Sequence, residues 1–82
     1  MGKFENVRAA ILSGSSDQNI AFADLTYFLD GLNFKLRIKG DHFIFTREGL
    51  AEIINIQPQG SKARAYQVKQ VRNLILKYGL TR

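Results

Sequence analysis

The chain has no cysteine and no tryptophan, and only one proline and one histidine in 82 residues. Without cysteine, disulfide bonds and thiolate metal sites are excluded, so a domain of this size must rely on its apolar core for stability. No stretch approaches the roughly 18 consecutive apolar residues that cross a bilayer, and the charged N-terminus lacks the apolar region of a signal peptide. We therefore expect a protein of the reducing cytoplasm that makes no use of a membrane.

Length and composition are those of one ordinary folded domain. Apolar residues make up 45% of the chain and charged residues 23%, which excludes a disordered or collagen-like segment. A chain of 82 residues is too short for a large multi-step enzyme or a big cofactor-binding fold. We predict a single domain over residues 1–82 that uses no cofactor.

Acidic residues are scarce in the second part of the chain. The formal net charge is +5, and residues 34–82 hold ten of the twelve basic residues but only three of the seven acidic ones. Concentrated positive charge favours a polyanionic partner such as RNA, although many small basic proteins have none. Contact with phosphate is therefore expected within residues 34–82.

Two apolar stripes at helical spacing predict two helices before residue 34. The first stripe consists of Phe4, Val7, Ala10 and Ile11, and the second of Phe22, Leu25, Phe28, Leu29 and Leu32. Gly14 ends the first helix and opens a polar linker, and Asn33, which tolerates a left-handed backbone, ends the second. Gly31 is expected to weaken the last turn of the second helix.

The hydrophobic period then changes from helical to two, as in a β-strand. Over residues 34–39 apolar and cationic side chains alternate, which predicts one apolar face and one basic outer face. The apolar members are Phe34, Leu36 and Ile38, and the cationic members are Lys35, Arg37 and Lys39. Turns at Gly40-Asp41 and Glu48-Gly49 separate this strand from two more, predicted over residues 42–47 and 52–57.

Pro58 ends the third strand, and residues 59–64 are predicted to form a flexible cationic loop. A last helix follows, and Gly79 ends it. Its apolar stripe consists of Val68, Val71, Leu74, Ile75 and Tyr78, with Gln67 away from that stripe. Short connections favour antiparallel neighbours, so we predict an α+β fold of order α-α-β-β-β-α, with helices on one face of a three-stranded antiparallel sheet.

His42 is the only side chain suited to acid–base chemistry at neutral pH. The alternative is a surface or half-buried histidine at the start of a strand with no chemical role. With one histidine, no cysteine and scattered carboxylates, we predict no metal site, a loosely held magnesium ion being the open alternative. The serines lie in turn-forming contexts without a nucleophile elbow, which argues against a serine hydrolase.

Two groups of cations are candidates for binding phosphate. Lys35, Arg37 and Lys39 form the basic strand face, and their alternative role is to protect an edge strand against aggregation. Lys62 and Arg64 precede the last helix, whose N-terminal amides and dipole also attract anions. The alternative for this second pair is a mobile basic loop.

The second strand is rich in large apolar side chains. Phe43, Phe45 and Tyr66 could stack on bases, but aromatic residues at strand spacing are more often core, so Phe43 and Phe45 are assigned to packing. Because Phe43, Ile44 and Phe45 place apolar groups on both faces of the sheet, something should cover the second face. The first helix could do so within the chain, or a partner protein could do so in trans.

The order of these signals resembles the HicA family of toxins, from about Ile20 to Leu80. The most specific part of the resemblance is a G-x-H-x-I-F pattern, formed by Gly40, His42, Ile44 and Phe45. It implies a fold like that of a double-stranded-RNA-binding domain, with residues 1–19 as an extra N-terminal helix and linker before a core of residues 20–82. It also implies the toxin role of a toxin–antitoxin pair, cleavage of mRNA with His42 as the catalytic histidine, and a HicB-like antitoxin as partner.

Three positions depart from the family pattern. Asp41 stands where the family usually has serine, and its carboxylate would either favour a charged imidazole beside it or compete with substrate phosphate. Asn33 replaces the usual glycine after the helix, a change that a left-handed cap tolerates. Many members carry a second histidine after the third strand, where this chain has Gln57-Pro58-Gln59, so a single-histidine mechanism is expected.

These expectations combine into a metal-independent endoribonuclease. His42 would act as general base on a ribose 2′-OH that attacks the adjacent phosphodiester. Lys39, Lys62 and Arg64 would stabilise charge on the phosphate oxygens, and the leaving oxygen would be protonated by water, by Lys39 or by a reprotonated His42. The alternatives are an RNA-binding module without chemistry, which recognises A-form shape and 2′-OH groups, and a purely protein-binding partner.

Overall fold

The structure is a computed structural model that describes residues 2–81 of the chain. The helices are α1 (Lys3–Ser13), α2 (Phe22–Gly31) and α3 (Ala65–Tyr78), with a 3₁₀ turn, η1 (Asp17–Asn19), between the first two. The strands are β1 (Lys35–Lys39), β2 (His42–Thr46), β3 (Ile54–Ile56), β4 (Pro58–Gln59) and β5 (Lys62–Ala63). The predicted α+β class and the order of its main elements are confirmed.

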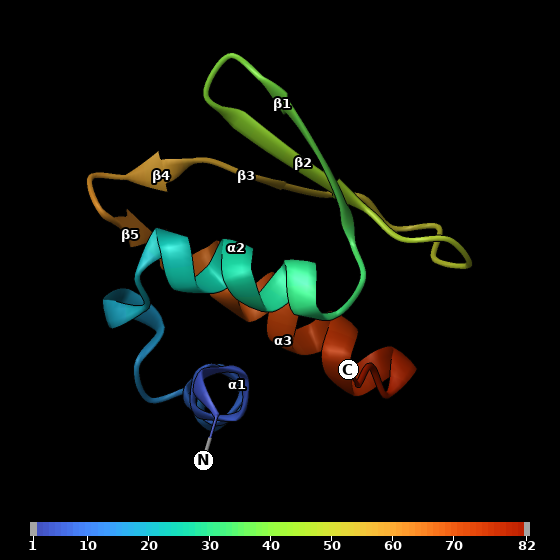
Figure 1. The fold of residues 1–82 in the computed structure, drawn as a ribbon. Coiled ribbons are helices and arrows are strands. Elements are labelled where there is room, and N and C mark those ends of the chain that lie inside the picture. Colours follow the sequence, from blue (N-terminus) through green and yellow to red (C-terminus); the bar gives the residue numbers. More distant parts are fainter. Residues whose placement is uncertain (1, 82) are drawn as a thin grey trace.

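β1, β2 and β3 form an antiparallel sheet in the order β1-β2-β3. Because directly opposed residues share a face, the register assigns every side chain of the sheet to one of two faces. The inner face carries Leu36, Ile38, Phe43, Phe45, Ile54 and Ile56. The other, called the basic face below, carries Lys35, Arg37, Lys39, His42, Ile44, Thr46 and Asn55. Both α2 and α3 lie on the side of the inner face (Figure 1), as predicted.

A single cluster of buried apolar side chains joins the helices to the sheet. α2 contributes Leu25, Phe28 and Leu29, α3 contributes Val68, Val71, Leu74 and Ile75, and the sheet contributes Phe45, Ile54 and Ile56. In a small domain without disulfide bonds, stability depends on this one core.

No helix among residues 2–81 is both long and apolar enough to cross a membrane.

α1 packs on the other helices and not on the sheet. It carries Phe4, Val7 and Ile11 into the shared core, and it lies on the side of α2 and α3 away from the sheet (Figure 1). Arg72 of α3 holds the C-terminal end of α1 in place. Its guanidinium donates to the Ile11 carbonyl (3.0 Å) and to both carboxylate oxygens of Asp17 (2.8 and 3.1 Å). The alternative in which the first helix covers the second face of the sheet is therefore wrong.

Gly31 has a packing role in addition to its weak helix propensity. A β-carbon at this position would lie 2.6 Å from the ring of Phe4, closer than van der Waals contact allows. That ring stacks on Phe28 with centroids 4.9 Å apart. The missing side chain at Gly31 therefore lets α1 approach α2 closely.

The prediction of a flexible loop over residues 59–64 is wrong, because β4 and β5 form a hairpin there. Two backbone hydrogen bonds tie this hairpin to the start of α2. The Phe22 N–H donates to the Ser61 carbonyl (2.9 Å), and the Ala63 N–H donates to the Ile20 carbonyl (2.9 Å). These partners lie about forty residues apart in the chain, so no local pattern reveals them.

The alternation predicted for β1 is confirmed, but its apolar side is left uncovered. Leu36 and Ile38 are 45% and 55% exposed, whereas Phe45, opposite Leu36, is buried in the core. Phe43 of β2 is covered at the start of α2, where Phe22 packs edge-on against it with centroids 4.9 Å apart. The helical layer therefore covers β2 and β3 and stops short of β1.

A polar cluster joins the segment before β3 to the end of α3. Glu52 accepts hydrogen bonds from the Tyr78 hydroxyl (2.6 Å) and from Lys77 Nζ (2.9 Å). The Tyr78 hydroxyl first, and the Lys77 ammonium second, lower the pKa of the Glu52 carboxyl to about 2 from an ordinary value of 4.5. A carboxyl with a lowered pKa in the folded state stabilises the fold above its ordinary pKa, and this contribution disappears as the pH falls through the folded-state value.

Glu52→Gln is expected to flatten the pH dependence of stability between pH 4.5 and about 2, because the glutamine side chain does not titrate. The free energy of unfolding, measured by urea titration at several pH values, gives that slope. Glu48→Gln is the matched control, since Glu48 is exposed and forms no ion pair among residues 2–81. If Glu52→Gln kept the pH dependence of the free energy of unfolding seen in the wild-type protein, Glu52 would not be the group responsible for it.

Candidate functional site

His42 is the first residue of β2 and projects from the basic face beside a tight turn. Gly40 and Asp41 connect β1 to β2, and Gly40 has the positive φ (+63°) that a two-residue hairpin turn requires. The register places Lys39 directly opposite His42. The His42 side chain is 46% exposed, so its imidazole is accessible from solvent.

Three polar side chains surround the imidazole. Nδ1 lies 3.0 Å from Oδ1 of Asn55 on β3. Nε2 lies 3.3 Å from Nε2 of Gln57, the residue between β3 and β4, and 3.8 Å from Oδ1 of Asp41. The Gln57 amide also donates to Oδ2 of Asp41 (3.2 Å). His42 therefore lies where the β1–β2 turn meets the end of β3.

These partners select one tautomer of the neutral imidazole. A carboxamide oxygen only accepts hydrogen bonds, so Nδ1 of His42 carries the hydrogen and donates it to Asn55. A carboxamide nitrogen only donates, so Nε2 of His42 holds the lone pair that accepts from Gln57. Asn55 thus orients the ring so that Nε2 is the basic nitrogen, as a general base requires.

A buried residue of α3 fixes the position of Gln57. Gln67, predicted to lie away from the buried side of this helix, is only 1% exposed, and that prediction is wrong. In the carboxamide orientation that matches donors to acceptors, the Gln67 side chain donates to the Gln57 carbonyl (3.2 Å) and accepts from the Gln57 N–H (3.0 Å). Both polar groups of the buried Gln67 side chain have hydrogen-bond partners in this way. The same two bonds fix the backbone of Gln57, whose side-chain amide contacts His42.

Lys35, Arg37 and Lys39 share the basic face with His42. All three are exposed, and none takes part in an ion pair within the described part of the chain. A hollow of about 240 Å³ opens on this side of the sheet, and it is lined by Lys35, Leu36, Arg37, Ile44, Thr46 and Ile53. The basic face therefore carries exposed cations, a partly apolar hollow and the imidazole, and His42 does not line that hollow.

Lys62 and Arg64 lie at the β5–α3 junction and not on the three-stranded sheet that carries the imidazole. Lys62 is on β5, and its Nζ donates to Oδ1 of Asn19 at 3.5 Å. Arg64 directly precedes α3 and is partly buried, and its enclosed Nε has no hydrogen-bond partner in the part of the chain that the structure describes. Among residues 2–81 no hydrogen bond or ion pair joins either cation to His42. Lys39 is the predicted cation that lies beside it.

The aromatic residues of β2 belong to the core. Phe45 is buried, and Phe43 packs against Phe22, so their assignment to packing is confirmed. Tyr66 in the first turn of α3 is exposed. Stacking on bases is therefore open to Tyr66 and not to the two phenylalanines.

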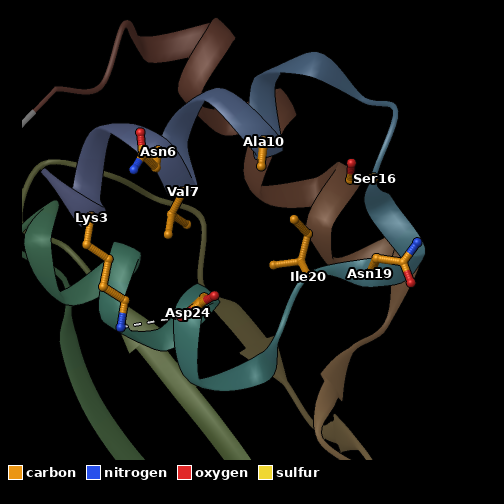
Figure 2. Close-up of a pocket in the computed structure, with 8 residues that line it drawn as sticks. All are labelled: Lys3, Asn6, Val7, Ala10, Ser16, Asn19, Ile20 and Asp24. Carbon is orange, nitrogen blue, oxygen red and sulfur yellow. Dashed lines mark ion pairs between the residues drawn. The ribbon is translucent and has the colours of Figure 1, made fainter. Parts of the chain in front are cut away.

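A separate cleft lies between α1 and the segment from η1 to α2 (Figure 2). Its lining residues are Lys3, Asn6, Val7, Ala10, Ser16, Asn19, Ile20 and Asp24. Lys3 and Asp24 form an ion pair at 3.4 Å across it. The cleft holds none of the predicted site residues, and no cluster of metal-ligating side chains occurs within residues 2–81. The candidate site is therefore the surroundings of His42.

Asn55 and Gln57 are site residues that the sequence reasoning missed. The run Ile54-Asn55-Ile56-Gln57 alternates, so its two polar residues point away from the inner face. That alternation was the available signal. Their approach to His42 depends on the pairing of β2 with β3, in which Ile44 lies opposite Asn55, and register is not contained in the pattern of one strand.

None of the known protein families, curated proteins or solved structures compared with the chain matches it. The resemblance to HicA toxins rests on the G-x-H-x-I-F pattern and the order of the elements in the sequence, and these comparisons add nothing to it. Function is therefore inferred from that resemblance and from the geometry around His42.

Proposed function

We propose that this protein is the toxin of a toxin–antitoxin pair, a metal-independent endoribonuclease that cleaves mRNA in the cytoplasm with His42. The observation that supports this most directly is an exposed imidazole, held through Nδ1 by Asn55 at 3.0 Å, on a sheet face whose three cations form no ion pair within residues 2–81. An imidazole of fixed orientation whose Nε2 carries the lone pair is suited to act as a general base, and a line of cations binds a phosphate backbone.

In the proposed reaction, Nε2 of His42 takes the proton of a ribose 2′-OH. The 2′ oxygen forms a bond to the adjacent phosphorus, and the bond from phosphorus to the 5′ oxygen breaks. The 5′ oxygen is protonated by water, by Lys39 or by His42 itself in a second step. The products are a 2′,3′-cyclic phosphate, or the 3′-phosphate formed by its hydrolysis, and a 5′-hydroxyl.

Neighbouring side chains have complementary roles in this scheme. Lys39, opposite His42 in the register, stabilises charge on the phosphate oxygens. Asp41 Oδ1, 3.8 Å from Nε2, pairs with the imidazolium once the proton has been transferred. The Gln57 amide, which donates to Nε2 in the free protein, turns to a phosphate oxygen when RNA binds.

A protein partner completes the proposal. The basic face is exposed over most of its residues, and Ile44 at its centre is only partly buried. We assign this face to a HicB-like antitoxin, acidic at the contact, that would shield His42 from RNA. Opposite charge on the two surfaces would speed their encounter.

A second function, RNA binding without chemistry, is favoured by one contact. The lone pair of His42 Nε2 is occupied by the Gln57 amide at 3.3 Å, as in a histidine that is a structural part of a binding surface. The basic face serves such a module equally well. Cleavage, rather than binding, separates the two functions.

Purified protein incubated with RNA in EDTA is expected to release fragments that end in a 2′,3′-cyclic phosphate or a 3′-phosphate, because the scheme needs only side-chain groups. Mass spectrometry of the fragments identifies the termini. A requirement for magnesium with 5′-phosphate products would contradict the mechanism. RNA binding without any cleavage, alone or during induction in cells, would establish the second function.

Replacing Lys35, Arg37 and Lys39 together by glutamine is expected to weaken RNA binding and to flatten its salt dependence. For single-stranded RNA the slope of log affinity against log salt falls by about 0.7 for each phosphate group that the protein no longer neutralises. Binding is measured in a His42→Ala background so that the RNA stays intact. The matched control replaces Lys62 and Arg64, which belong to the β5–α3 junction and not to the basic face, and a larger effect in this control would move the phosphate path to that junction.

A further inference from the structure

β1 is an edge strand with one free side. Within residues 2–81 it pairs only with β2, at the end of the order β1-β2-β3. In an antiparallel ladder, alternate residues turn their N–H and C=O groups away from the neighbouring strand. β1 therefore presents a row of unpaired backbone donors and acceptors, which is the template for adding another strand.

The two sides of β1 differ in chemistry. Lys35, Arg37 and Lys39 point to the basic face without ion-pair partners among residues 2–81, while Leu36 and Ile38 point to the inner side and are 45% and 55% exposed. A strand added at this edge would place alternate side chains beside the cations and beside the two apolar groups. It would also continue the inner face, which the helices cover only as far as β2.

The charge on β1 decides between possible occupants. A second copy of the chain pairing through β1 would place lysine and arginine against lysine and arginine, and like charges directly opposite each other destabilise a sheet. RNA would engage the cations but would use neither the backbone groups nor Leu36 and Ile38. A segment with alternating acidic and apolar residues satisfies all three features.

We propose that β1 is the docking site for an extended, acidic segment of another protein, which adds to the sheet as a fourth strand. Its acidic side chains pair with Lys35, Arg37 and Lys39, and its apolar side chains cover Leu36 and Ile38. This inference does not depend on the proposed nuclease activity, because binding is measured without RNA.

The test uses the full chain and a synthetic peptide, Val-Glu-Val-Glu-Val-Glu-Val, with blocked ends. Isothermal titration calorimetry measures its affinity, and hydrogen exchange followed by NMR reports which amides become protected. Protection is expected at β1, on the side away from β2. A peptide of the same sequence with N-methylated valine amides keeps the charges but loses backbone donors, so its affinity is expected to fall at least tenfold.

Variants of the chain separate the contributions. Leu36→Thr with Ile38→Thr places strand-compatible, β-branched residues at both positions and is expected to lower affinity at least fivefold. Leu76→Ala, at an exposed leucine of α3 on another part of the surface, is expected to leave the affinity unchanged. Arg37→Gln is expected to lower the affinity and its salt dependence.

Three outcomes would overturn the proposal. The first is that the peptide does not bind, or that the N-methylated peptide binds equally well. Equal binding would mean that the contact depends on charge attraction and not on backbone hydrogen bonds. The second is a loss of affinity in Leu76→Ala equal to that in the β1 variant. The third is sedimentation of the chain alone as a dimer that Leu36→Thr with Ile38→Thr dissociates, since the edge would then belong to a second copy.

Discussion

His42→Ala is expected to lower RNA cleavage by roughly 10²–10⁴-fold, the usual contribution of a general base, and to leave the fold intact. The side chain is 46% exposed and adds little to the core, so its removal costs little packing. Cleavage rate is measured on purified protein, and growth arrest after induction is measured in cells. Near-UV circular dichroism and the urea midpoint check the fold.

Control variants make this prediction specific. Asn73→Ala alters an exposed polar residue of α3, which lies on the other side of the sheet, and should cleave at the wild-type rate. Asn55→Ala should lose less activity than His42→Ala, because it frees the imidazole to turn without removing it. Asn55→Asp keeps an acceptor oxygen for Nδ1 and should recover part of that loss. Full toxicity of a well-folded His42→Ala protein would end the catalytic assignment.

Phe4→Ala is expected to lower the free energy of unfolding by about 3–5 kcal/mol, the usual cost of removing a buried phenylalanine ring. Phe4 lies in the shared core, stacks on Phe28 and fills the space that Gly31 leaves open. Since small domains have about 5–15 kcal/mol in total, this loss is a large fraction of the stability. Urea unfolding followed by circular dichroism measures it.

Phe4→Leu retains most of the apolar volume and should lose less, which keeps the comparison measurable if Phe4→Ala does not fold. Leu76→Ala is the surface control, because Leu76 is an exposed apolar residue of α3. A loss below about 1 kcal/mol for Phe4→Ala, in the range of surface substitutions, would mean that α1 is not an integral part of the core.

Much of the candidate site could be read from short segments. His42 stands out because it is the only histidine, and the turn at Gly40 places it at the start of a strand. Period-two alternation alone predicts that Lys35, Arg37 and Lys39 lie on one face of the sheet. Asn55 and Gln57 could not be assigned in this way, because their contacts with His42 join segments more than ten residues apart.

For the fold as well, the secondary-structure elements could be predicted from the sequence, whereas their packing could not. Helix stripes, strand alternation and glycine stops are set by backbone geometry over a few residues, and the helices ending near Gly14 and Gly79 were readable for that reason. Where α1 packs, whether residues 59–64 form a hairpin, and whether Leu36 and Ile38 are covered depend on contacts between distant segments. Only the tertiary structure decides these points, because whether a residue is buried depends on the surface that packs against it as much as on the residue itself.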